Sequence, residues 1–170
     1  MRVSLRGMIF LLLVLCAVAF AAPAKNDAVP MKKATAKKSL VHWMDYSQAM
    51  EKAKSDQKLI FVDLYADWCI PCRVMDANVY SDPTVASLLN TRFYAVRLDA
   101  ESQDSIVCDG QKKTVQRCYF DVWELHALPA FVLVAPKGMS ILTVTDSMTP
   151  QELLFMLRQF LEKEKEWISR

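Results

Sequence analysis

The 170-residue chain lacks three features that would assign whole classes of function. Its longest apolar run, from Met8 to Phe20, is shorter than the roughly twenty residues that a membrane-spanning helix needs. It has only two histidines, His42 and His126, and so few ligands for a structural zinc site. It has no basic stripe, because residues 41–170 hold fourteen lysines and arginines against eighteen aspartates and glutamates. Nucleic-acid binding and a zinc-stabilised fold are therefore disfavoured.

The N-terminus has the layout of a secretory signal. Arg2 and Arg6 precede an apolar run from Met8 to Phe20, which is followed by small residues. We expect a signal peptide over residues 1–24 with cleavage before Ala22 or Lys25, and hence a periplasmic or otherwise exported protein. An uncleaved membrane anchor is the alternative. A lipoprotein is disfavoured because Leu15, rather than a small residue, precedes Cys16.

Residues 25–40 form a basic segment ahead of an acidic body. They contain five lysines, a single acidic residue at Asp27, and Pro30. This composition favours a flexible linker, and contact with anionic lipid is the alternative. The remaining residues, 41–170, are long and apolar enough for one domain with its own core.

Strand-like and helix-like patterns alternate along this domain, which predicts an α/β fold. A helix is expected over residues 46–55 with Ser47 as its N-cap, and a fully buried strand over residues 59–65. Pro136–Gly138 would join two antiparallel strands, and Thr149 and Glu152 form a capping box. Two further helices are expected, one from the cysteine motif to residue 79 and one over 83–89. The remaining elements are a strand over 93–98, a polar segment and a helix over 115–122, strands over 130–135 and 140–145, and a helix from the capping box to residue 161.

Cys69 and Cys72 lie at a junction between a strand and a helix. That position would place Cys69, exposed, at the helix N-terminus, where free backbone N–H groups favour a thiolate. Cys69 is therefore the expected nucleophile, quickly alkylated when reduced, and Cys72 the thiol that resolves the mixed disulfide. Pro71 would stiffen the turn. Taken alone, the spacing also suits half of a zinc site.

The run from Asp63 to Cys72, with the sequence DLYADWCIPC, resembles the active-site segment of the thioredoxin superfamily. It is most similar to the C-terminal periplasmic domain of the thiol–disulfide interchange protein DsbD, including a similar Ser81-Asp82-Pro83. Small exported reductases such as DsbH are also similar. The resemblance covers about residues 45–165. It implies a thioredoxin-like fold, with a central mixed sheet flanked by helices on both faces.

The same resemblance implies roles for individual residues. Leu128–Pro129 would be the family's cis-proline site facing the cysteines, with Trp68, Ile70 and Pro71 completing the substrate-binding surface. Asp63 would be the buried acid that assists proton transfer at Cys72, and burial would raise its pKa. The alternative for Asp63 is a purely structural pair with Arg97.

Cys108 and Cys118 fall in a region where the pattern departs from that of shorter relatives. The stretch between Leu98 and Val115 is about ten residues longer than theirs. A loop that folds back would allow a structural Cys108–Cys118 disulfide, whereas one continuous helix would hold the two residues about 15 Å apart. In the latter case Cys118 would be a buried inert thiol and Cys108 an exposed one.

The resulting hypothesis is a protein-disulfide reductase without a cofactor. Ile70 and Pro71 offer no cationic or hydrogen-bonding side chain to over-stabilise a thiolate, which favours a potential near about −270 mV over one near about −120 mV. The expected partners of this monomer are disulfide-containing exported proteins and a membrane electron donor of the DsbD type. A disulfide oxidase or isomerase, and a binding module without redox turnover, remain the alternatives.

Overall fold

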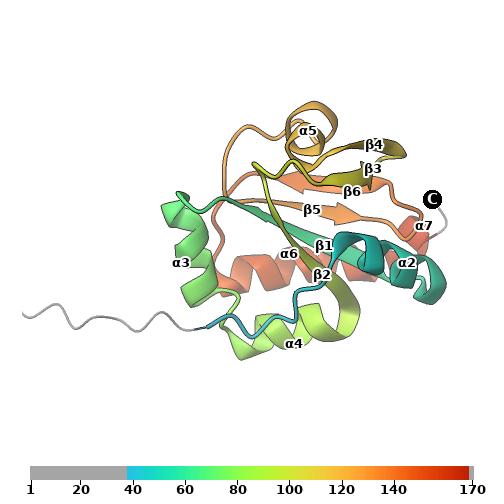
Figure 1. The fold of residues 1–170 in the computed structure, drawn as a ribbon. Coiled ribbons are helices and arrows are strands. Elements are labelled where there is room, and N and C mark those ends of the chain that lie inside the picture. Colours follow the sequence, from blue (N-terminus) through green and yellow to red (C-terminus); the bar gives the residue numbers. More distant parts are fainter. Residues whose placement is uncertain (1–37, 169–170) are drawn as a thin grey trace, which may run out of the picture. The chain divides into compact units, whose positions relative to one another are not determined.

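The computed structural model describes residues 38–168 (Figure 1). The expected signal peptide and all but the last three residues of the expected linker lie outside this range. Within it, no helix is both long enough and apolar enough to cross a membrane.

A four-stranded mixed sheet forms the centre of the fold, in the order β2-β1-β5-β6. β1 (Leu59–Tyr65) pairs in parallel with β2 (Phe93–Asp99) and antiparallel with β5 (Ala130–Val134), which pairs antiparallel with β6 (Ser140–Val144). β1 and β5 are almost entirely buried because their continuous apolar runs are covered on both faces. The mixed sheet predicted from the sequence is confirmed.

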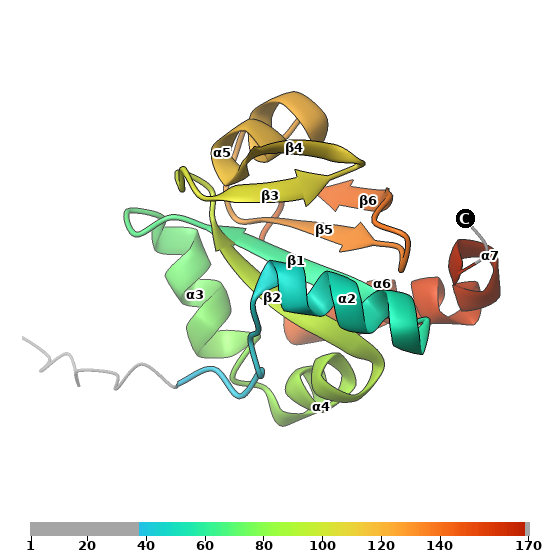
Figure 2. The ribbon, with the colours of Figure 1, turned by 45° about the vertical axis from the view of Figure 1, so that its right-hand side comes forward.

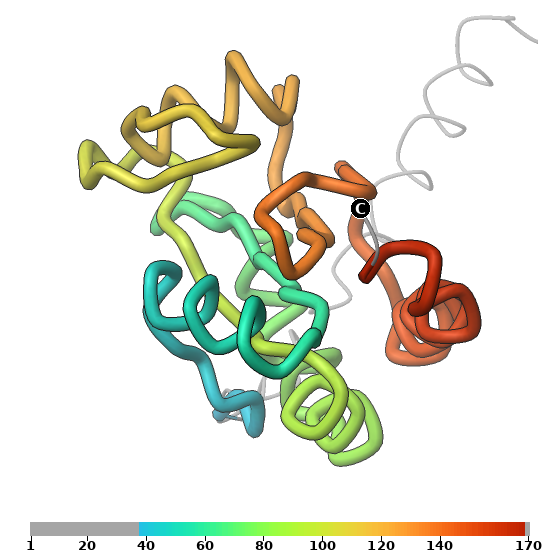
Figure 3. The backbone as a smooth tube through the Cα atoms, turned by 90° about the vertical axis from the view of Figure 1, so that its right-hand side faces the viewer, coloured from blue at the N-terminus to red at the C-terminus, as the bar shows by residue number. Residues whose placement is uncertain are grey.

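Helices cover both faces of this sheet, each over its own apolar cluster (Figures 2 and 3). α3 (Ile70–Asn78), α4 (Pro83–Arg92) and α6 (Pro150–Glu162) pack on the cluster that contains Phe61 and Phe131. α2 (Tyr46–Asp56) packs on the opposite cluster, which contains Val62 and Val132. The alternation of these strand residues between clusters follows from the two-residue period of a strand.

The helix ends follow local capping chemistry. The expected capping box of Thr149 and Glu152 is present at the start of α6. The cap of α2 is Asp45 rather than Ser47, because the Asp45 carboxylate accepts a hydrogen bond from the Gln48 backbone N–H at 3.0 Å. A further short helix, α7 (Glu164–Ile168), follows α6 and was not predicted.

The region between β2 and β5 differs most from the sequence prediction. Instead of a polar segment and one helix, it contains a hairpin of β3 (Ser105–Cys108) and β4 (Gln111–Thr114), then α5 (Val115–Arg117) and the π-helical turn η1 (Cys118–Val122). Asp109 and Gly110 form the hairpin turn with φ of 45° and 76°. Both positive values suit the Asp-Gly pair that such turns prefer.

Candidate functional site

Cys69 and Cys72 form a disulfide at the N-terminal end of α3, with 5.3 Å between their Cα atoms. Cys69 is the N-cap of the helix, and its Sγ accepts a hydrogen bond from the Cys72 backbone N–H at 3.1 Å. Pro71 lies in the first turn, where its missing N–H leaves no helical hydrogen bond unmade. This geometry would stabilise negative charge on Cys69 more than on Cys72.

The expected exposure of Cys69 is wrong for this oxidised form. Cys69 is 1% exposed and Cys72 is 4% exposed, because Ala66 and Leu128 pack against the pair. The exposed side chains are the flanking Trp68 and Ile70, at 63% and 65%. Exposed apolar side chains therefore lie on both sides of the buried Cys69 in the sequence.

The Leu128–Pro129 peptide bond is cis and immediately precedes β5. Since Ala130 of β5 pairs with Leu64 of β1, this bond lies at the end of the sheet where β1 leads into the cysteine turn. The Leu128 side chain packs against the cluster formed by Ala66, Cys69 and Cys72. The sequence-predicted groups Trp68 to Cys72 and Leu128–Pro129 thus lie together.

Asp63 is buried inside β1, with 2% exposure, beneath this end of the sheet. Its Oδ1 accepts a hydrogen bond from the Tyr80 hydroxyl at 2.8 Å, and its Oδ2 lies 3.3 Å from Arg97 Nε, an ion-pair contact without hydrogen-bond geometry. Burial raises the pKa of Asp63 to about 6, although Arg97 and Tyr80 both oppose the increase. The structure therefore contains the pairing with Arg97, together with the raised pKa that a base would need.

Asp76 belongs to the same group of charges and was not predicted. The Arg97 guanidinium donates two hydrogen bonds to the Asp76 carboxylate, at 2.6 and 2.8 Å. A pocket of about 410 Å³ beside Cys72 is lined by both residues, together with Tyr65, Ala66, Asp67 and Arg73. Asp76, Arg97 and Asp63 form a continuous line of charge from this pocket to the buried strand. Asp76 lies four residues after Cys72 on the same helix, and this spacing was the sequence signal that could have identified it.

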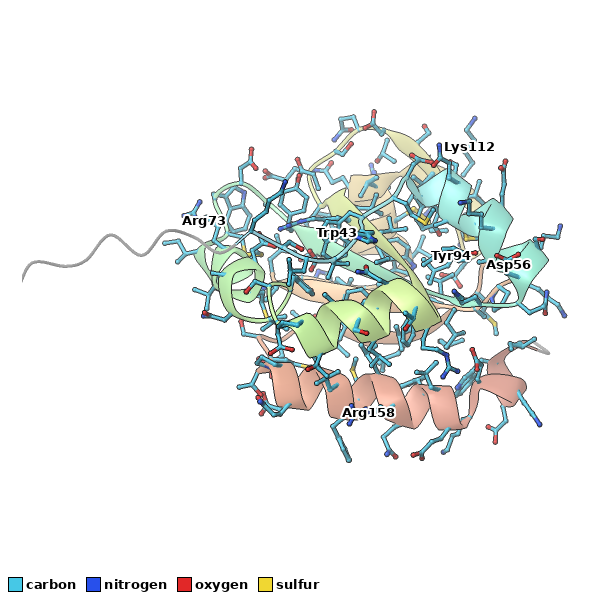
Figure 4. The ribbon with its side chains drawn as sticks, turned by 90° about the horizontal axis from the view of Figure 1, so that it is seen from below. Trp43, Asp56, Arg73, Tyr94, Lys112 and Arg158 are labelled. Carbon is cyan, nitrogen blue, oxygen red and sulfur yellow. A yellow bond between two sulfur atoms is a disulfide. The ribbon has the colours of Figure 1, made fainter. Side chains whose placement is uncertain are left out.

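Arg73 lies at the α3 end of the sheet, whereas the hydrogen-bonded Tyr94 and Asp56 lie at the other end (Figure 4). The Arg73 guanidinium donates a hydrogen bond to the Asp67 carbonyl at 2.7 Å. This contact ties the first turn of α3 to the segment that precedes Cys69.

Cys108 and Cys118 form a second disulfide, with 6.0 Å between their Cα atoms. Both residues are fully buried, in the cluster that contains Val96 and Val132. The β3–β4 hairpin brings Cys108 back to the start of η1, so one continuous helix does not connect the two residues. Among residues 38–168, no group of three or more histidine, cysteine, aspartate or glutamate side chains could hold a metal ion.

Comparison with known proteins identifies the family. A family model described as thioredoxin-like matches residues 42–136. The chain belongs to the thioredoxin-like family. It is 32% identical over 90 residues to the thiol:disulfide interchange protein DsbD 1 of Pseudomonas aeruginosa, and 34% identical over 90 residues to DsbD of Pseudomonas fluorescens. Each match covers 53% of this chain but only 14% of the relative.

Solved structures confirm the thioredoxin fold. A thioredoxin from Thermus thermophilus matches with a TM-score of 0.59 and 24% identity, over 73% of this chain and 89% of its own. A DsbH oxidoreductase matches with a TM-score of 0.57 and 16% identity, over 74% and 88% of the two chains. The oxidised C-terminal domain of Neisseria meningitidis DsbD matches with a TM-score of 0.51 and 20% identity, over 70% and 98%.

Proposed function

We propose that the protein is an exported thiol–disulfide oxidoreductase that reduces disulfides of other proteins through Cys69 and Cys72. The observation that carries this proposal is the disulfide at the start of α3, with Cys69 Sγ accepting the Cys72 N–H and with cis Leu128–Pro129 beside it. A purely structural disulfide needs neither a helix N-terminus to stabilise a thiolate nor a surrounding apolar surface.

The cycle begins with the reduced dithiol. The Cys69 thiolate attacks one sulfur of a partner disulfide, and the partner's second sulfur leaves as a thiolate that takes up a proton. Cys72 then loses its proton and attacks Cys69 Sγ, which releases the partner's first sulfur as a thiolate. Two electrons pass from the dithiol to the partner, and the Cys69–Cys72 disulfide remains. Asp63 is the proposed acceptor of the Cys72 proton, because its raised pKa suits a base near neutral pH.

The proposed direction of reaction rests on the side chains around the cysteine pair. Ile70 and Pro71 place no cation or hydrogen-bond donor side chain beside the sulfurs. An ionised Asp63 would disfavour a further thiolate on the Cys72 side and so favour a reducing dithiol, although Arg97 pairs with both Asp63 and Asp76 and offsets part of their charge. The oxidised product must be reduced again, so a membrane electron donor of the DsbD type is the proposed partner. The proposed substrates are disulfide-containing exported proteins.

Insulin reduction driven by dithiothreitol, combined with equilibration against glutathione, tests the activity and its direction. The proposal expects catalysed insulin reduction and a potential near about −270 mV. A potential above about −180 mV without insulin reduction would instead indicate an oxidase or isomerase. Full cellular function of a Cys72→Ser variant would favour a binding module without redox turnover.

Export is tested separately on the full-length chain. We expect the protein in the periplasmic or secreted fraction, with a mature N-terminus at Ala22 or Lys25. An intact N-terminus in the membrane fraction would support the uncleaved anchor instead.

A further inference from the structure

Two aromatic side chains form an exposed surface that the proposed chemistry does not use. Phe120 of η1 is 45% exposed, and its ring stacks on the exposed His126 with centroids 6.0 Å apart and planes 29° apart. The ring of the buried Tyr119 meets the Phe120 ring edge-on, with the two centroids 4.7 Å apart. We call Phe120 and His126 the aromatic ledge.

The π-helical turn explains why Phe120 points outward. The Trp123 N–H donates to the Cys118 carbonyl at 2.9 Å, closing a turn one residue wider than in an α-helix. Cys118, Tyr119 and Trp123 are buried, so the extra residue leaves Phe120 on the surface. The Cys108–Cys118 disulfide fixes the start of this turn. Phe120 is thus held on a turn anchored by a disulfide, whereas His126 lies in the segment that leads from η1 to β5.

The aromatic ledge continues the surface around the catalytic disulfide. His126 is two residues from Leu128, and hence at most about 7 Å from it along the chain. The Leu128 side chain packs against Cys69 and Cys72. The segment between η1 and β5, which contains His126, leads to the end of the sheet where β1 enters the cysteine turn. Leu128 thus connects the aromatic ledge to the cysteine pair, so a residue close in sequence to a cysteine bonded to Cys69 is the one placed to contact the ledge.

We propose that the aromatic ledge binds an aromatic side chain of the partner polypeptide, close in sequence to the cysteine that Cys69 attacks. This inference rests on the proposed function and names its substrate class. Stacked rings offer a flat apolar surface that favours another ring through burial and ring–ring geometry. Trp68 and Ile70 bind the partner around its cysteine. Phe120 and His126 favour partners that carry an aromatic side chain near that cysteine.

Three disulfide-linked peptide dimers test this selection with the reduced full chain. One carries phenylalanine two residues before the cysteine, one carries it two residues after, and one carries serine at both positions. We expect one phenylalanine peptide to react about tenfold faster than the serine peptide, the factor that corresponds to 1.4 kcal/mol.

The variants separate recognition from chemistry. Phe120→Ala should abolish the preference and leave the serine peptide and the iodoacetamide rate of Cys69 unchanged. His126→Phe should keep the preference, because it retains a stacking ring. Phe155→Ala is the matched control, since Phe155 is a 67% exposed phenylalanine on α6.

Three outcomes overturn the inference. The wild type shows no preference, Phe120→Ala retains it, or Phe120→Ala slows all three peptides equally. If the wild type exchanges with none of the peptides, the proposed function itself fails. The three outcomes above overturn only the role of the aromatic ledge and leave the proposed function standing.

Discussion

The two disulfides of this protein are the same kind of bond, but their surroundings differ in almost every respect. Cys69–Cys72 begins a helix, has exposed Trp68 and Ile70 on either side, and adjoins a pocket. Cys108–Cys118 is fully buried and joins a hairpin to η1 inside an apolar cluster. The surroundings of each pair, and not the bond itself, are the basis for proposing that Cys69–Cys72 is the pair that exchanges electrons.

The largest effect should come from the first pair alone. Cys69→Ser removes the proposed nucleophile, so insulin reduction should fall to the rate of dithiothreitol without protein. Cys72→Ser should accumulate a mixed disulfide with the partner, visible as a mass adduct on Cys69, because no thiol remains to resolve it. Accumulation of the adduct in Cys69→Ser instead would reverse the two roles.

Removing the second pair should affect stability and not chemistry. In the chain-entropy description, a disulfide across a separation of 10 residues contributes about 3 kcal/mol. Cys108→Ala with Cys118→Ala should therefore lower the free energy of unfolding in urea by about that amount. Insulin reduction below the unfolding transition should be retained. Loss of turnover in a folded double variant would show that both pairs belong to one redox system.

Asp63→Asn should raise stability at neutral pH. Burial places the folded-state pKa at about 6, above the unfolded value of 3.8. The folded state thus binds the proton more tightly, which favours folding below pH about 4, and this advantage is lost as pH rises through 6. Asparagine carries no charge at any of these pH values, so the variant does not lose this stability. Its free energy of unfolding should exceed that of the wild type by up to about 3 kcal/mol at pH 7 and equal it at pH 4.

Urea unfolding of this variant across pH 4 to 8 provides the measurement. Asp67→Asn is the matched control, because it makes the same substitution at an exposed position. Lower stability of Asp63→Asn at pH 7 would mean that the Arg97 and Tyr80 contacts outweigh burial.

The smallest effect should come from the tip of the hairpin. Asp109 accepts hydrogen bonds from the backbone N–H and the hydroxyl of Ser140, at 2.7 and 2.8 Å. Asp109→Ala should cost about 1–2 kcal/mol of stability and leave insulin reduction intact. Glu101→Ala is an exposed control in the preceding loop. Equal unfolding free energies for both variants would show that the hairpin is not held by this contact.

The sequence was sufficient for the central sheet because β5 is an unbroken apolar run and β1 is interrupted only by Asp63, so burial leaves both strands little freedom. The cysteine motif pointed to Cys69 and Cys72 as candidates, and the family resemblance that this motif carries added Asp63 and Leu128–Pro129. The structure brings these residues to the same end of the sheet.

The remaining features depend on contacts that a linear pattern does not reveal. The β3–β4 hairpin was missed although Asp109–Gly110 is a strong turn signal, because its strands are only four residues long and β4 is polar. Asp76 was missed because its importance comes from Arg97 on a different element. The π-turn at Cys118 depends on packing and on the second disulfide.

The central claim is that one disulfide is redox-active and the other structural, and one titration tests it directly. The folded protein is equilibrated at a series of glutathione and dithiothreitol potentials, alkylated, and mapped by peptide mass to report each pair separately. The account predicts that Cys69–Cys72 opens near about −270 mV, while Cys108–Cys118 stays closed until the potential falls below about −300 mV. Opening of both pairs together, or of Cys108–Cys118 first, would contradict it.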